Sequence, residues 1–350
     1  MTVLSNDKDL VHNDPTRLHA RQLLLLACGG RLSRVIHVLA ELGVADILAD
    51  GPLPVGTVAE RAGAHPDALY RVLRNAASVG VFEEGPGKVF RLTPLAEGLR
   101  SDNGDGVLPL VRYNNLELTA RPYDEIMHSV RTGEPAVEKA LGMSFNAYLE
   151  KNPEVGLFFN EFMSFWSRQF VEEELEQYHF ERFTSLADLG GGDGFFLAQV
   201  LRRNPGMRAY LTDYPDEVRK AGQVLAEHGV GDRVTVEGGD LLESEIVPGY
   251  DAYLFKAVLH WMSDEKAEHL LRKTRAAIGG SGARLLVFDS VLAPDNAWDH
   301  GKFLDVDMLV LFGGRERSLD DWRALFARAG FELVREPSVY HWTLLECKAV

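Results

Sequence analysis

Residues 185–201 read SLADLGGGDGFFLAQVL, and this stretch decides the fold of the chain. An apolar run is followed by a glycine-rich loop and then by a second apolar run, which predicts a strand, a tight turn and a helix. Glycines let a backbone turn sharply and approach a ligand closely. A dinucleotide fingerprint would need a glycine where Phe195 stands. The loop instead has the pattern Gly-x-Gly-x-Gly, formed by Gly190, Gly192 and Gly194 after Asp188.

Outward from this loop, short apolar runs alternate with helical patterns as far as residue 292. The runs are RAYLTDY (208–214), RVTVEGGD (233–240), YDAYLFK (250–256) and RLLVFDSVL (284–292). Such alternation is typical of a parallel sheet with helices on both faces. We therefore predict an α/β domain over residues 181–350.

The first hundred residues follow another pattern. Apolar positions at helical spacing over residues 16–48, interrupted by Gly29 and Gly30, predict two packed helices. Residues 57–92 then predict helix, turn, helix and a strand pair, which together make a winged helix. We expect this module over residues 1–105 and a mostly helical, aromatic-rich segment over 106–180. Simple core packing would explain many of these rings equally well.

A winged helix also occurs in DNA-binding regulators, and its second helix carries Arg71 and Arg74 here. The chain has a net charge of −15, however, which disfavours contact with a phosphate backbone. The apolar character of the same helix favours a dimer core instead. We therefore expect no nucleic-acid partner, and a salt-dependent DNA-binding assay would decide between the two functions.

Composition indicates an ordinary globular chain, with 46% hydrophobic and 25% charged residues. The longest aliphatic cluster near the start, residues 23–26, is far shorter than the roughly 20 apolar residues of a membrane span. The opening residues are polar and acidic, unlike a signal peptide. Cys28 and Cys347 make no disulfide framework, so we expect a cytoplasmic protein without a membrane partner.

Several motifs in order resemble the O-methyltransferases of the plant caffeate type and of bacterial natural-product biosynthesis. They are LSRVIHVLAELGVADILADGP (32–52), DLGGGDG (188–194), GGDLLE (238–243), FKAVLHWMSDE (255–265) and LFGGRERS (311–318). The resemblance covers nearly the whole chain. It implies a class I S-adenosylmethionine methyltransferase with a Rossmann-like sheet, preceded by a winged-helix dimerisation domain, and a homodimer. S-adenosylmethionine would be the cofactor and S-adenosylhomocysteine its product.

The family's cofactor contacts map onto residues after the predicted strands. Asp213 follows the second strand, where a carboxylate can accept both ribose hydroxyls, although a solvated turn Asp is the simpler alternative. The resemblance also implies a role for Asp188 and the three loop glycines, for Asp240 and Leu241 at the adenine, and for Lys256 and Ser167 near the methionine part. Lys256 could instead be a surface lysine with a buried stem.

The predicted catalytic group is His260, which follows a strand end and resembles the family's general base. A hydroxyl is a poor nucleophile until a base removes its proton, and an imidazole base is usually oriented by a carboxylate. Asp289 and Glu316 match the two family acids that frame this histidine. Either could instead pair with Arg315 or Arg317.

The sequence departs from the family at two places. Trp261 and Met262 follow His260, where relatives commonly have His-Asp-Trp or His-Asn-Trp, and Leu311-Phe312 replaces an Asn of the plant enzymes. The positions that match the acceptor pocket are apolar and favour a flat hydrophobic acceptor; they are Phe159, Met163, Met308 and Phe312.

We therefore predict methyl transfer to a hydroxyl of a small aromatic metabolite in natural-product biosynthesis, for example of an antibiotic. No His, Cys or Asp cluster has the sequence spacing of metal ligands, so no metal is expected. Two alternatives stay open. One is N- or C-methylation, and the other is a relative that uses the cofactor without methyl transfer, for decarboxylation, hydroxylation or cyclisation.

Overall fold

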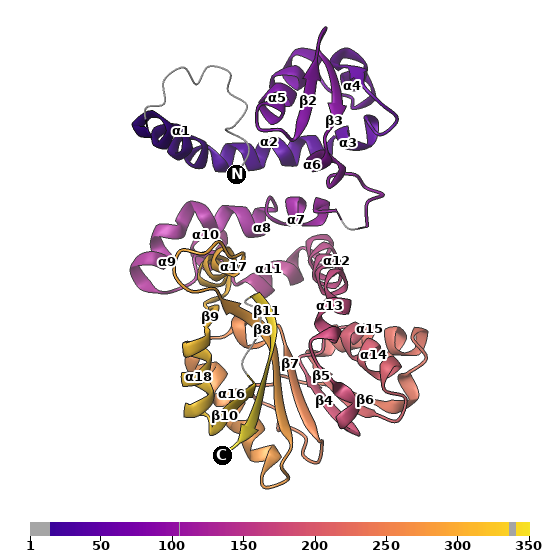
Figure 1. The fold of residues 1–350 in the computed structure, drawn as a ribbon, viewed down its shortest axis with the longest axis vertical. Coiled ribbons are helices and arrows are strands. Elements are labelled where there is room, and N and C mark those ends of the chain that lie inside the picture. Colours follow the sequence, from indigo (N-terminus) through magenta and orange to yellow (C-terminus); the bar gives the residue numbers. More distant parts are fainter. Residues whose placement is uncertain (1–14, 105, 336–340) are drawn as a thin grey trace. The chain divides into compact units, whose positions relative to one another are not determined.

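The computed structural model describes residues 15–104, 106–335 and 341–350, which form two compact units, one that ends at Ala120 and one that begins at Arg121. Figure 1 shows the helices and strands of both units. No helix in these described ranges is both long and apolar enough to cross a membrane.

The first unit is mainly helical and contains the predicted winged helix. Its helices are α1 (Pro15–Ala27), α2 (Gly29–Glu41), α3 (Val44–Ile47), α4 (Val55–Arg61), α5 (Pro66–Ser78), α6 (Pro94–Glu97), α7 (Leu108–Tyr113) and α8 (Glu117–Ala120). A small antiparallel sheet has the order β1 (Leu53–Pro54), β3 (Val89–Leu92), β2 (Phe82–Gly85). Pro66 starts α5 where its missing N–H costs nothing, and the His65 side chain caps the helix. The core of this unit is apolar and includes Leu39, Leu73, Phe82 and Phe90.

Short helices begin the second unit. They are η1 (Arg121–Glu125), α9 (Ile126–Thr132), α10 (Val137–Leu141), α11 (Phe145–Lys151), α12 (Pro153–Gln169), α13 (Val171–Glu176) and η2 (Phe180–Arg182). The long helix α12 and its continuation α13 contact helix α14, and α13 also contacts strand β11. These contacts bring Ser167 and Glu174 to the edge of the sheet that follows.

The sheet has the order β10-β11-β8-β7-β4-β5-β6, with β9 paired to β8. Its strands are β4 (Ser185–Leu189), β5 (Arg208–Asp213), β6 (Val234–Gly238), β7 (Ala252–Lys256), β8 (Arg284–Leu292), β9 (Arg317–Ser318), β10 (Phe331–Arg335) and β11 (His341–Ala349). Strands β4 to β8 are parallel, and β11 is antiparallel to β8 and β10. The strands predicted from the alternating runs are all present, and β11 and β10 extend the sheet beyond β8 as two antiparallel strands, with β10 at the edge.

Helices cover both faces of this sheet (Figure 1). The helices and turns of this part of the chain are α14 (Phe195–Arg203), α15 (Pro215–Glu227), η3 (Gly231–Arg233), η4 (Leu259–Trp261), α16 (Asp264–Ile278), α17 (Gly301–Asp307), the π-helix η5 (Met308–Phe312) and α18 (Leu319–Arg328). Neighbouring residues of one strand belong to opposite cores: Leu186 packs with α14 and α15, whereas Ala187 packs with α16 and α18. A sheet buried on both faces leaves the carboxyl ends of its parallel strands as the place for a site.

Candidate active site

The glycine loop connects β4 to α14 at the carboxyl edge of the sheet. The Gly190 N–H donates to the carbonyl oxygen of Thr212 (2.7 Å), which ties the loop to the neighbouring strand. A Cβ atom at Gly190 would lie 2.5 Å from Cγ2 of Val258, so a side chain does not fit there. Gly192 has a φ of +56°, and a Cβ there would meet nothing within 4 Å. Because Gly192 lines the large cavity of this unit, a side chain at this position would project into it.

Two carboxylates follow the next strands. Asp213, the last residue of β5, accepts hydrogen bonds from the backbone N–H groups of Gly192 (2.8 Å) and Tyr214 (2.7 Å). Burial raises the pKa of Asp213, and these two bonds oppose that shift. Asp240 accepts from the N–H of Leu242 (2.8 Å), and Asp240 and Leu241 both line the cavity.

A cluster of charged and polar side chains lies beside the glycine loop. Lys256 Nζ is 3.2 Å from Glu174 Oε1 and 3.4 Å from Ser167 Oγ, and the side chain of Glu174 is only 4% exposed. Asp188 is also buried, and burial raises its pKa to about 7, with the Asp213 charge acting in the same direction. Within the described residues, Asp188 Oδ1 and Glu174 Oε2 have no hydrogen-bond partner. Buried acceptors of this kind call for a cationic or hydrogen-bonding ligand.

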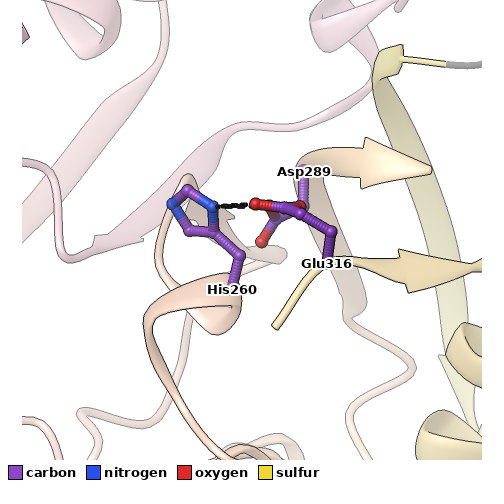
Figure 2. Close-up of side chains that lie close together, drawn as sticks. All are labelled: His260, Asp289 and Glu316. Carbon is purple, nitrogen blue, oxygen red and sulfur yellow. Dashed lines mark hydrogen bonds and ion pairs between the residues drawn. The ribbon is translucent and has the colours of Figure 1, made fainter. Parts of the chain in front are cut away.

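His260 lies in the turn η4 after β7, and two acids from other segments converge on it (Figure 2). Its Nδ1 is 2.7 Å from Glu316 Oε1 and 3.8 Å from Asp289 Oδ1. All three side chains are buried. Nε2 points away from both carboxylates in Figure 2 and has no hydrogen-bond partner among the described residues. Burial lowers the pKa of His260, but the two negative charges outweigh it, so the net shift is upward. Burial raises the pKa of Asp289.

The loop that carries Glu316 is held against the histidine turn by its backbone. The Arg315 N–H donates to the carbonyl oxygen of His260 (2.9 Å). This contact requires glycine at position 314, since a Cβ there would lie 2.1 Å from that same oxygen. Ala257, three residues before His260, has a φ of +55°. Backbone strain in a residue other than glycine is typical of functional sites.

Arg317 stabilises the same turn through hydrogen bonds to its backbone. Its guanidinium is fully buried and donates to the carbonyl oxygens of Leu259 (3.0 Å) and Met262 (3.1 Å) and to Asp264 (3.0 Å). Arg317 therefore pairs with Asp264, and Glu316 bonds His260 rather than an adjacent arginine. The alternative that Glu316 is a mere salt-bridge partner of Arg315 or Arg317 has no support in these contacts.

A cavity of about 1190 Å³ extends along the carboxyl edge of the sheet. Most of the residues predicted from sequence line it; they are Phe159, Met163, Ser167, Asp188, Gly190, Gly192, Asp213, Asp240, Leu241, Lys256 and Phe312. Gly194 and Met308 do not. Gly194 caps α14 with a φ of +76°, and Met308 is 2% exposed in the core. His260, Asp289 and Glu316 lie behind the lining, next to Trp261, Met262 and Trp342, which belong to it.

The three catalytic candidates also offer one ligand atom each within 4.8 Å of one another, as a metal site would. The 2.7 Å separation of Nδ1 and Oε1 is that of a charge-assisted hydrogen bond, however, which engages both atoms with each other. A metal-free site stays a prediction, which a rate unchanged by chelators would support.

Sequence reasoning missed several residues of this site. Glu174 lies in the acidic run VEEELE (171–176), which looks like a solvated helix, so no signal marks it. Phe145 and Trp342 line the cavity from segments without a motif. Gly314 and Arg317, by contrast, belong to the quoted segment LFGGRERS, where two glycines beside charged residues do mark a close approach of backbones.

Fold and site together define a class I S-adenosylmethionine-dependent methyltransferase. Residues 123–332 match the O-methyltransferase domain family, and residues 24–102 match the O-methyltransferase dimerisation domain. The chain belongs to this O-methyltransferase family, and its cofactor is S-adenosylmethionine. The family and fold predicted from the sequence are thereby confirmed.

Individual relatives span almost the same length. A phenazine O-methyltransferase of Lysobacter antibioticus is 37% identical over 329 residues, which cover 94% of this chain and 96% of that enzyme. An 8-amino-8-demethylriboflavin N,N-dimethyltransferase of Streptomyces davaonensis is 34% identical, with coverages of 95% and 96%. A crystal structure of an O-methyltransferase from neocarzinostatin biosynthesis, in complex with S-adenosylmethionine and 2-hydroxy-5-methyl naphthoic acid, has 30% identity, a TM-score of 0.78 and coverages of 91% and 96%.

Proposed function

We propose that this enzyme transfers a methyl group from S-adenosylmethionine to the hydroxyl of a small aromatic acceptor, with His260 as the general base. The observation that carries the proposal is the buried pairing of Nδ1 with Glu316 at 2.7 Å, which leaves Nε2 without a partner among the described residues. Aromatic acceptors are supported by relatives that act on phenazine and naphthoate compounds. The similar O-methyltransferase from neocarzinostatin biosynthesis supports a role in natural-product biosynthesis.

The hydrogen bond to Glu316 determines which nitrogen of His260 acts. When Nδ1–H donates to this carboxylate, the neutral imidazole presents a lone pair at Nε2. Nε2 accepts the proton of the acceptor hydroxyl, and the imidazolium so formed is stabilised by the charges of Glu316 and Asp289. The carboxylates thus make His260 a stronger base, which agrees with the upward direction of its pKa.

The cofactor fits the residues at the glycine loop. Bound there, S-adenosylmethionine supplies an electrophilic methyl group on a cationic sulfur. Asp213 would hold the ribose, Asp240 and Leu241 the adenine, and Ser167 with Lys256 the methionine part. The buried acceptor atoms of Asp188 and Glu174 match the positive charge of this ligand. Glycine at 192 leaves room for its approach.

N-methylation is a second candidate, because a relative at 34% identity is an N,N-dimethyltransferase. An aromatic amine can attack through its own lone pair before it loses a proton, whereas a hydroxyl benefits from a strong base. The two carboxylates around His260 therefore favour a hydroxyl. Matched phenol and aniline acceptors, each incubated with labelled cofactor, test whether oxygen or nitrogen is methylated. The methylated product is detected by its mass shift.

Asp213→Ala should weaken binding of S-adenosylhomocysteine by roughly 10- to 100-fold, because a charged acceptor for hydrogen bonds is lost. Titration calorimetry measures the effect. Asp216→Ala, an exposed neighbour on α15, is the matched control and should bind normally. Equal affinities for both variants would show that the ribose site has been misassigned.

We further propose that the enzyme is a homodimer assembled through residues 15–100. The side chains of three leucines on α1 are 64–75% exposed within a single chain: Leu23, Leu24 and Leu26. Exposure of so much apolar surface to water is unfavourable. Leu23→Asp combined with Leu26→Asp should therefore shift sedimentation at micromolar concentration from dimer to monomer. Arg71→Asp, on the exposed side of α5, brings the same kind of charge and should leave the dimer intact. An active monomeric wild type contradicts the proposal.

A further inference from the structure

Trp261 immediately follows His260, and its indole belongs to a group of four aromatic rings that all line the cavity. Its ring centroid is 4.2 Å from that of Phe312 and 6.5 Å from that of Phe159. Phe145 completes the group, at 4.6 Å from Phe312 and 5.3 Å from Phe159. Each ring thus contacts two others. The result is a continuous aromatic wall made by the turn η4, the π-helix η5 and the helices α11 and α12.

The backbone of Trp261 is fixed by what surrounds it. Its N–H donates to the carbonyl oxygen of Val258 (3.3 Å), and a Cβ at Gly314 would lie only 2.9 Å from its Cα. Arg317 holds the carbonyl oxygens on either side of the dipeptide His260-Trp261. An indole on so constrained a backbone is a pre-formed surface, which costs little entropy when a ligand packs on it.

His260 contacts two indoles. The Trp261 ring is 5.6 Å from the imidazole at 89°, and the Trp342 ring is 5.6 Å from it at 79°. Both tryptophans line the cavity, whereas His260 is 3% exposed and lies behind them. A hydroxyl that approaches the imidazole from the cavity must therefore pass along these indoles. A planar ring can pack its whole face on an indole, whereas a saturated, puckered ring cannot.

We infer that Trp261 is the specificity-determining residue of the acceptor site, and that it selects planar, fused-ring aromatic hydroxyl compounds by packing against their ring face. The inference rests on the proposed function, because it takes the acceptor side of the cavity to be the side at His260. A π-face contact favours an extended planar ring over a saturated one of equal size. The departure from the family pattern at this position then has a direct role in acceptor choice.

Two probes of the same skeleton test the inference. 1-Naphthol is planar, and 5,6,7,8-tetrahydro-1-naphthol carries its hydroxyl in the same place beside a puckered ring. Binding of each to enzyme loaded with S-adenosylhomocysteine is measured by calorimetry. We expect wild type to prefer 1-naphthol and Trp261→Ala to weaken its binding by roughly three- to tenfold, with much less effect on the tetrahydro compound. Trp261→Phe should keep most of the preference.

Trp298→Ala, which removes an exposed indole outside the cavity, is the matched control and should behave as wild type. Unchanged affinity for S-adenosylhomocysteine shows that a variant is folded. If Trp261→Ala does not fold, the expected smaller loss of the preference in Trp261→Phe decides, and a preference equal to that of wild type in Trp261→Phe then counts against the inference. A wild type that does not prefer the planar probe, or a preference that survives Trp261→Ala, overturns the inference. His260→Gln separates it from the proposed function, since that variant should lose turnover and keep the preference for 1-naphthol.

Discussion

Replacement of His260 by alanine or glutamine should lower turnover by about 10²- to 10⁴-fold, which is the usual contribution of a general base. The affinity for S-adenosylhomocysteine should stay the same. Among the described residues, no hydrogen bond joins His260 to a residue that we assign to the cofactor. Single-turnover rates and calorimetry separate the two effects. His179→Gln, whose side chain is 89% exposed, is the control for loss of a histidine and should keep full turnover.

The pH dependence of turnover also tests the role of His260, and its direction follows from the pKa of the imidazole. Only the neutral imidazole accepts a proton, so wild-type turnover should rise with pH through the pKa of His260 and then level off. Since Asp289 and Glu316 hold that pKa above its usual value, Glu316→Gln should move the rising limb to lower pH while it also slows the reaction. In His260→Ala the rate should instead keep rising until the acceptor hydroxyl ionises by itself. Wild-type turnover by His260→Ala at neutral pH would mean that proximity alone suffices.

Much of this site could be predicted because its residues follow strands. In parallel sheets the carboxyl ends of the strands meet at one edge, so Asp213, Asp240, Lys256 and His260 are brought together by the alternation of strands and helices alone. The strand pattern therefore predicted both the fold and the edge on which the cavity lies. By the same logic, the glycine loop predicted the part of this edge that we assign to the cofactor.

Residues outside this alternation could not be found in this way. Glu174 approaches Lys256 because α13 packs on α14 and β11. The acidic sequence of α13 does not predict this tertiary contact. The position of His260 behind the cavity lining depends on the indoles of Trp261 and Trp342, and β11 brings the second of these from the far end of the chain. Met308 had the apolar character of a pocket residue, but the π-helix turns it into the core.

Gly314→Ala tests the geometry of the site without removing an ionisable group, because Gly314 itself has no side chain. A Cβ atom there would lie 2.1 Å from the carbonyl oxygen of His260 and 2.6 Å from the carbonyl carbon of Trp261. Both contacts are with backbone, so no side-chain rotation relieves them. Gly314→Ala must move the loop away from the turn, and the bond from the Arg315 N–H to His260 is then lost together with the 2.7 Å pairing of Glu316.

We expect Gly314→Ala to lower turnover by about 100-fold or more, since a displacement of roughly 1 Å in a catalytic group has an effect of this size. Overpacking should also reduce the free energy of unfolding by about 1–3 kcal/mol, measured by urea denaturation. Gly206→Ala, where a Cβ meets nothing within 4 Å, is the matched control and should leave both quantities unchanged. The affinity for S-adenosylhomocysteine should survive in Gly314→Ala, because the glycine loop lies on other strands. A variant with lowered stability and full turnover would show that the bond between Glu316 and His260 is not needed for proton transfer.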